Sequence, residues 1–295
     1  MRREMAEAVS DLIEQHEDTC LFLADIGVHL FRRVIKKYPQ RAMNIGIFED
    51  GMISVAAGLS IGGMEPVVYG IAPFLLERAL EQLKLDFAYQ NLGGNFIAAG
   101  AAYDFSFLGY SHYCPEDFAI LKNIPGVEFI APGCGKEFQS LFKECSMNHH
   151  PTYYRMSDYP NRHCFDVTFG KANVIKKGTK AVVIAAGTIL DTVLDAVRDE
   201  DVTLLYYTTL APFDTQTLAK NCISGRILIC EPEFSGSLDS LILPAFENRA
   251  LRIAHAGLPV SIYRNYGTKK EKDRYYGLTV QNIRAKLNQL IESGE

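Results

Sequence analysis

The sequence lacks the features of a membrane, secreted or nucleic-acid-binding protein. No apolar run reaches the roughly 20 residues that a helix needs to cross a bilayer. The start, MRREMAEAVSDLIEQHEDTC, has no apolar core of the kind that a signal peptide carries. Positive charge is not in excess either, because 30 Lys and Arg stand against 35 Asp and Glu, for a net charge of −5. We therefore expect a cytoplasmic protein that binds neither membranes nor nucleic acid.

The cysteines lack the spacing of a metal or redox site. All seven are scattered along the chain, and none forms a CxxC pair or a Cys/His ligand pattern. An odd number at wide spacing is typical of reduced thiols inside the cell. The sequence thus predicts reduced, mostly buried cysteines and no zinc site.

What the sequence does contain is a regular alternation of short apolar runs and longer amphipathic segments. Such alternation predicts parallel strands joined by crossover helices. The fold class is therefore α/β, with two tandem three-layer α/β/α domains and mainly parallel sheets, at 1–160 and 173–295, joined by a linker at 161–172. The strand candidates are CLFLAD, MNIGIF, PVVYGI, NFIAAG, VEFIAP and an added edge strand YYRMS in the first domain, and AVVIAAG, VTLLYYTT, RILICEP and PVSIYRNYG in the second.

A few residues stand where ligands gather in open parallel sheets, at the carboxyl ends of strands. Glu49 lies where a strand gives way to a helix, as either a proton-holding carboxylate in a crevice or an acid favoured by the helix dipole. Phe74 follows a strand end, and either stacks on a flat ring or belongs to the core. Arg78 and Gln82 share one helix face, four residues apart.

Two further candidates follow later in the first domain. His112 lies in a Gly-containing loop, in LGYSHYCPED, where a histidine is either an acid/base group near neutral pH or an ordinary surface residue. Arg155, in PTYYRMSD, stands at a strand end and suits either an anionic substrate or a structural ion pair. None of these residues decides a function alone.

The order and spacing of the segments resemble the C-terminal half of transketolase and its relatives over nearly the whole chain. KYPQRAMNIGIFED resembles the segment that carries the family's catalytic glutamate, and ERALEQLKLDFAYQNL resembles its R-A-x-D-Q helix. GYSHYCPEDFAILKNIPGVEFIAPG resembles its G-P-T-H loop and E-D helix. AVVIAAGT, APFDTQTL, ILICEPEFSGSLDS and RNYGTKKEKDRYYGLT resemble its second domain. The resemblance implies a thiamine-diphosphate pyrimidine-binding domain followed by a transketolase C-terminal domain.

The resemblance also implies a partner chain. The family binds the cofactor's diphosphate and Mg²⁺ through a domain with a Gly-Asp-Gly motif followed by an Asn, and this sequence contains no Gly-Asp-Gly. Mg²⁺ prefers octahedral oxygen ligands, which include cofactor phosphates. We therefore expect the diphosphate-binding domain and the Mg²⁺ ligands on a separate subunit, in an α2β2 heterotetramer whose active sites lie between chains.

The function implied is that of a thiamine-diphosphate-dependent transferase, active only with its partner, that moves a two-carbon ketol unit between sugars. Glu49 would bind the aminopyrimidine ring, and His112 would contact sugar hydroxyls or shuttle protons. The remaining contacts implied are Ile71, Phe74 and Arg78 for the cofactor's pyrimidine and Arg155, with His112, for the substrate.

Three departures from the family pattern predict an unusual substrate. Leu108 stands where the family commonly has an Asp, and Ile71 replaces a second pocket aromatic. Asp158 takes the place of an arginine often used for sugar phosphates, and a carboxylate there would repel phosphate. Arg162 and His163 lie nearby in sequence and could compensate.

Two other functions remain open at this point. One is a decarboxylating relative, either a deoxyxylulose-phosphate synthase type or the beta subunit of a 2-oxo acid dehydrogenase, which would share Glu49, Phe74 and the C-terminal domain. The other is a non-catalytic paralogue that only binds a partner or ligand. Pyruvate decarboxylation separates the first from a ketol transferase, and a lack of cofactor-dependent turnover identifies the second. The sequence does not specify the donor, the acceptor, the pathway or whether the substrates are phosphorylated.

Overall fold

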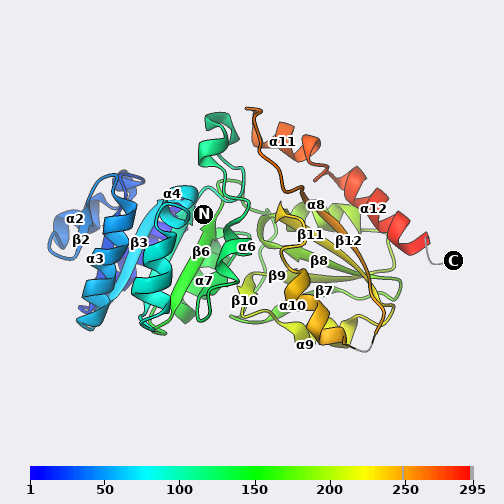
Figure 1. The fold of residues 1–295 in the computed structure, drawn as a ribbon, viewed down its shortest axis with the longest axis horizontal. Helices are drawn as coiled ribbons and strands as arrows, with labels where there is room; N and C mark the ends of the chain where they lie inside the picture. Colours follow the sequence, from blue (N-terminus) through cyan, green and yellow to red (C-terminus); the bar gives the residue numbers. More distant parts are fainter. Residues whose placement is uncertain (248, 293–295) are drawn as a thin grey trace.

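The computed structural model describes residues 1–247 and 249–292, which form two mainly parallel β-sheets with helices packed on both faces (Figure 1). The first sheet has the strand order β10-β5-β6-β4-β3-β1-β2, and the second has the order β12-β11-β8-β9-β7. This arrangement confirms the predicted α/β class. Within the described ranges, no helix combines the length and apolar character needed to cross a membrane.

The first sheet is formed mainly by residues up to 156. Its central strands are buried over almost their whole length, as parallel strands covered on both faces must be. The strands are β1 (Thr19–Leu23), β2 (Ala42–Asn44), β3 (Glu65–Ile71), β4 (Gly94–Ala99), β5 (Glu128–Ile130) and β6 (Pro151–Met156). The helices are α1 (Arg2–Gln15), η1 (Val28–Leu30), α2 (Arg32–Lys37), α3 (Glu49–Ile61), α4 (Ala72–Leu76), α5 (Leu80–Gln82), η2 (Leu83–Ala88), η3 (Ser106–Leu108), η4 (Tyr110–His112), α6 (Asp117–Leu121) and α7 (Gly135–Cys145).

The second sheet is formed by residues from 172 on. Its strands are β7 (Ala172–Lys176), β8 (Val182–Ala186), β9 (Thr203–Tyr207), β11 (Arg226–Phe234) and β12 (Arg252–Leu258), while β10 (Thr209–Ala211) belongs to the first sheet. The helices are η5 (Gly187–Ile189), α8 (Leu190–Ala196), α9 (Thr215–Asn221), α10 (Asp239–Ile242), η6 (Leu243–Phe246), α11 (Lys269–Tyr275) and α12 (Val280–Glu292). The sequence also predicts helices in SLDSLILPAFENRAL and TVQNIRAKLNQLIES, of which Asn248 and Ser293 lie outside the described residues.

Two strand predictions were wrong. YYRMS is not an edge strand, because β5 and then β10 extend the sheet beyond β6. PVSIYRNYG is not a strand either: the last strand is β12, which ends at Leu258. The next residue, Pro259, has no N–H to continue a ladder, which explains why the strand stops there.

The two parts of the chain are joined by more than the linker. β10 pairs antiparallel with β5, so the second half of the sequence contributes a strand to the first sheet. The linker is tied to the N-terminus of α7 by a disulfide between Cys134 and Cys164, whose Cα atoms are 6.0 Å apart. The prediction of reduced cysteines was therefore wrong for this pair, because residues 30 apart in sequence are adjacent in the fold. The other five cysteines are free and buried.

Candidate active site

Three loops that follow parallel strands meet at one edge of the first sheet. β2 and β3 both pair parallel with β1, and β4 pairs parallel with β3, so the carboxyl ends of all of them face the same way. The segments after β2, β3 and β4 carry Glu49, Phe74 and His112 respectively. The rule for ligand sites in open parallel sheets therefore selects this edge.

Glu49, Arg78, Phe74 and His112 form a continuous chain of contacts at this edge. The Nη1 atom of Arg78 donates a hydrogen bond of 2.6 Å to Oε2 of Glu49. The same guanidinium lies over the Phe74 ring, 4.6 Å from its centroid. Phe74 in turn contacts His112 edge-on, with ring centroids 5.1 Å apart. The structure thus brings together four residues that lie up to 63 positions apart in sequence (49 to 112).

Glu49 is the most enclosed member of this group. Its side chain is only 2% exposed, and it begins α3, where the positive end of the helix dipole stabilises a carboxylate. Gly51, the third residue of the helix, leaves room for the Phe48 ring, since a Cβ there would lie 2.0 Å from that ring and displace it. Among the described residues, Oε2 is bound by Arg78 and Oε1 has no hydrogen-bond partner. One carboxylate oxygen is therefore held and the other is available.

His112 ends the short helix η4 and is partly exposed. Its Nδ1 lies 3.1 Å from the Ser111 hydroxyl. Burial lowers the pKa of His112 below its usual 6.5, because desolvation disfavours the charged ring. The ring is therefore mainly neutral at pH 7, with one nitrogen able to accept a proton or hydrogen bond and the other able to donate one.

Arg155 is placed differently from the other candidates. It is 4% exposed and pairs with two buried carboxylates, Asp117 at the start of α6 and Glu233 on β11. Its Nε donates to Asp117 Oδ2 at 2.8 Å, and its guanidinium lies over the Phe129 ring at 4.7 Å. This environment is that of the structural ion pair considered from the sequence, within an inter-domain cluster.

The other residues singled out by the sequence also have partners inside the chain. Ile71, at the end of β3, is partly buried next to α4. Asp158 is bound by Arg2, whose Nε and Nη2 each lie 2.7 Å from a carboxylate oxygen. Arg162 and His163 both bind Asp191 on α8. The involvement of Arg2 had no signal in the sequence, because the pair is 156 residues apart.

The loop after β4 also contains a buried acid, Asp104, which is 3% exposed. Its Oδ2 accepts a hydrogen bond of 2.9 Å from the Asp158 N–H. Burial raises the pKa of Asp104 from 3.8 to about 7, with the Ser157 hydroxyl and the nearby Lys269 opposing the shift. The folded state therefore holds this proton more tightly than the unfolded state.

Replacing Asp104 with Asn should stabilise the protein in a pH-dependent way. Because the folded-state pKa is raised, wild-type stability falls as pH rises from about 4 to about 7, and Asn, which cannot ionise, avoids that loss. The advantage of the variant should grow over this window, by at most about 4 kcal/mol, and stay constant above it. Urea unfolding from pH 4 to pH 8 measures it, with the exposed Asp199→Asn as control; a pH-independent difference would contradict the assignment.

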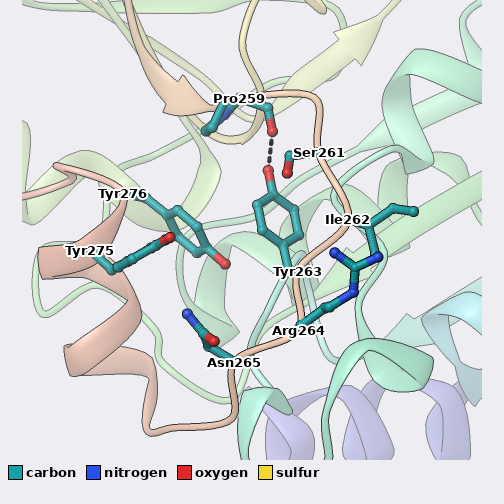
Figure 2. Close-up of a pocket in the computed structure, with 8 residues that line it drawn as sticks. All are labelled: Pro259, Ser261, Ile262, Tyr263, Arg264, Asn265, Tyr275 and Tyr276. Carbon is teal, nitrogen blue, oxygen red and sulfur yellow. Dashed lines mark hydrogen bonds between the residues drawn. The ribbon is translucent and has the colours of Figure 1, made fainter.

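A separate hollow lies in the second half of the chain. It has a volume of about 190 Å³ and is lined by Pro259 and residues 261–265 with Tyr275 and Tyr276, not by Glu49 or His112 (Figure 2). In the part of the chain that the structure describes, no cluster of His, Cys, Asp and Glu side chains could hold a metal ion.

Residues 1–158 match the family described as "Transketolase, pyrimidine binding domain". The chain belongs to the transketolase family. The chain is also 34% identical, over 287 residues, to an uncharacterized 33.6 kDa protein in the fasciation locus of Rhodococcoides fascians, with 96% of this chain and 92% of that protein covered. The resemblance drawn from the sequence is confirmed.

Its relatives include subunits of split transketolases. It is 26% identical to one of the subunits of the apulose-4-phosphate transketolase of Actinobacillus succinogenes, with 84% of each chain covered. A solved split-gene transketolase, an inactive β4 tetramer, has the same fold, with a TM-score of 0.88 at 22% identity over 99% of this chain and 98% of that one. Transketolase from Campylobacter jejuni superimposes with a TM-score of 0.82 at 15% identity, but 98% of this chain covers only 46% of that enzyme.

Proposed function

We propose that this protein is one subunit of a split thiamine-diphosphate-dependent transketolase, which transfers a two-carbon ketol unit between sugars. The observation that carries the proposal is the contact chain from Glu49 through Arg78 and Phe74 to His112. It joins an enclosed carboxylate, an aromatic ring and a neutral histidine at the ligand-binding edge of a parallel sheet.

These residues fit the pyrimidine end of the cofactor. Among the described residues, Oε1 of Glu49 has no hydrogen-bond partner and could bind a ring nitrogen, and Phe74 offers a partly exposed aromatic ring. One face of that ring is covered by the Arg78 guanidinium, so a stacked pyrimidine has to use the opposite face or displace Arg78. Thiamine diphosphate, when bound, supplies the carbanion chemistry that no protein side chain provides.

The chain's own residues would orient the reactants and handle protons. Arg78 fixes Oε2 of Glu49, so that Oε1 can hold a hydrogen bond or proton in a defined direction. His112, neutral at pH 7, can hydrogen-bond a sugar hydroxyl or accept a proton at a ring nitrogen. Leu75, Leu76 and Ala79, in the same segment as Phe74 and Arg78, are buried in the core.

We assign the docking of the diphosphate-binding partner to an exposed apolar face beside Glu49. After Asp50, α3 reads GMISVAAGLSI, without a charge and apolar all round, a pattern typical of a helix covered on every side. It lies beside η2, to which it is linked by a 2.7 Å hydrogen bond from Ser54 Oγ to Asp86 Oδ2. The apolar face consists of exposed side chains of these two helices and their flanks: Ile47, Phe48, Val55, Ile61, Leu85 and Tyr89.

Exposed apolar side chains on two neighbouring helices and their flanks mark an interaction site more often than a solvated face. Because α3 begins with Glu49, a partner on this face would also close over the carboxylate. In the proposed α2β2 assembly, the active site would lie between chains, and the partner would carry the Mg²⁺ ligands and the diphosphate site.

The experiment is calorimetric titration of thiamine diphosphate, with Mg²⁺, into the chain alone, the partner alone and their mixture. The partner to be used is a protein that carries the Gly-Asp-Gly motif, sought first among the products of neighbouring genes. We expect tight binding and ketol transfer only in the mixture, and a loss of both with Val55→Glu, which puts a charge into the apolar face. The matched control is Val174→Glu, on the exposed surface of β7.

Other outcomes would point to the alternatives. Cofactor binding in the mixture with release of CO₂ from pyruvate, and no ketol transfer, would identify a decarboxylating carboligase; a 1-deoxy-D-xylulose-5-phosphate synthase of Thermus thermophilus is 27% identical over 85% of this chain. Assembly without cofactor binding would identify a non-catalytic partner. Either result would overturn the transketolase assignment.

A further inference from the structure

We infer that the C-terminal domain positions His112 by clamping both ends of the loop that presents it. This loop, residues 106–117, belongs to the pyrimidine-binding domain, yet its ends are held by segments from β11 to α11. In Figure 1 its short helices lie beside the segment that leads from β12 to α11. The inference rests on the proposed function, because the role of His112 is part of that proposal.

The upstream end of the loop lies directly against the segment of the C-terminal domain that precedes α11. The Ser106 hydroxyl donates a 2.7 Å hydrogen bond to the Gly267 carbonyl, across 161 residues of sequence. Gly109 has φ +90° and faces the Tyr266 ring so closely that a Cβ would lie 2.7 Å from it. Only glycine combines this backbone angle with this approach. The turn before His112 is thus shaped to fit the C-terminal domain.

A cluster of tyrosine rings continues the contact around His112. Tyr263, 6% exposed, packs against Tyr110 and Tyr113, the residues on either side of the Ser-His pair, with centroids 6.2 and 5.9 Å apart. Its far side is supported by Tyr276, at 5.0 Å, and its hydroxyl donates to the Pro259 carbonyl (Figure 2). Tyr263, a residue of the C-terminal domain, therefore packs directly against the turn that carries His112.

The downstream end is fixed by a buried ion cluster. Phe234, the last residue of β11, donates its N–H to the Pro115 carbonyl at 3.1 Å. Next to it, Arg155 bridges Asp117 and Glu233. Burial raises the pKa of Glu233, while Arg155 opposes the shift, so the carboxylate depends on this arginine. His112 lies between the two clamped ends and reaches back to Phe74.

The geometry therefore makes Tyr263 a positioning residue for His112. A displacement of about 1 Å at a reacting group can cost roughly 100-fold in rate. The Glu49 and Phe74 side of the site has no contact with Tyr263 among the described residues, so cofactor binding should not depend on it. A Tyr263 variant should therefore lose turnover and keep its affinity for the cofactor, a combination that general destabilisation would not produce.

The test compares Tyr263→Leu with Tyr263→Phe and Tyr275→Leu in the complex with the partner. Tyr263→Leu should lower kcat by about 10- to 100-fold and raise KM for the sugar acceptor, with unchanged thiamine-diphosphate affinity. Tyr263→Phe keeps the ring and should retain wild-type kinetics. Tyr275, 68% exposed, lines the same hollow and contacts Tyr276, so its replacement should have little effect.

A second measurement keeps the inference separate from the proposed function. The His112 ring signal, assigned in NMR spectra by its loss in His112→Gln, reports its pKa in the chain without any turnover. Freed from its packing, His112 in Tyr263→Leu should titrate closer to 6.5. An unchanged His112 titration and unchanged kinetics in a folded Tyr263→Leu would overturn the inference, even if the protein proves to be a transketolase. If the His112 pKa shifts in Tyr263→Leu but the wild-type complex shows no ketol transfer, the positioning of His112 is supported and the proposed function is wrong.

Discussion

Glu49→Gln is expected to reduce ketol transfer by the assembled enzyme by about 10²- to 10⁴-fold, the range for loss of a general acid–base group. Glutamine has the same shape and can still accept the Arg78 hydrogen bond through its amide oxygen. Its amide group cannot hold and release a proton at the position that Oε1 of Glu49 occupies. Steady-state rates with the partner, thiamine diphosphate and Mg²⁺ measure the loss.

The matched control for Glu49→Gln is Glu81→Gln, an exposed carboxylate on α5. It should leave the rate unchanged, and both variants should assemble with the partner by sedimentation. Near-normal turnover in an assembled Glu49→Gln enzyme would show that proton transfer at this carboxylate is not part of the mechanism.

Arg155→Met is expected to cost about 3 to 5 kcal/mol of unfolding free energy, because it leaves Asp117 and Glu233 buried without their common cation. The loss should be greater at pH 8 than at pH 5. Unpaired buried carboxylates have raised pKa values in the folded state, so their stability contribution falls as pH rises towards those values. Urea unfolding at the two pH values measures both effects.

The contrasting variant is Arg155→Met combined with Asp117→Asn and Glu233→Gln, which removes the charges together. It should recover part of the lost stability and lose the pH dependence. If Arg155 instead serves the substrate, as the sequence resemblance implied, Arg155→Met should keep its stability within about 1 kcal/mol and raise the KM. The two roles thus predict opposite results from one variant.

The predicted elements succeeded where local pattern decides the structure. Runs such as PVVYGI and NFIAAG are short and mainly apolar on both faces, a pattern typical of a covered parallel strand. PVSIYRNYG failed because it begins with Pro259, which has no N–H for a ladder. The prediction that YYRMS is an edge strand failed for a different reason. The position of a strand within a sheet depends on which other strands lie beside it, and β10, which extends the first sheet, comes from residues 209–211.

The candidate site likewise contains residues whose placement follows from local pattern and one whose placement does not. Glu49, Phe74 and His112 were predictable as neighbours, because each follows a strand of one parallel sheet and the carboxyl ends of such strands face one edge. Arg155 also stands at a strand end, and nothing local distinguishes it from a substrate ligand. Its second partner, Glu233, lies 78 residues away and in the other domain.

The sequence alone determined the α/β class, the transketolase family and the residues that line one edge of the first sheet. These follow from apolar periodicity and from the ends of strands, which are properties of short segments. Only the tertiary structure decided the ion cluster of Arg155, the Cys134–Cys164 bond and the packing of Tyr263 on the His112 loop. These contacts join segments that lie far apart in the sequence, and no local pattern records which distant residue will face another once both sheets have formed.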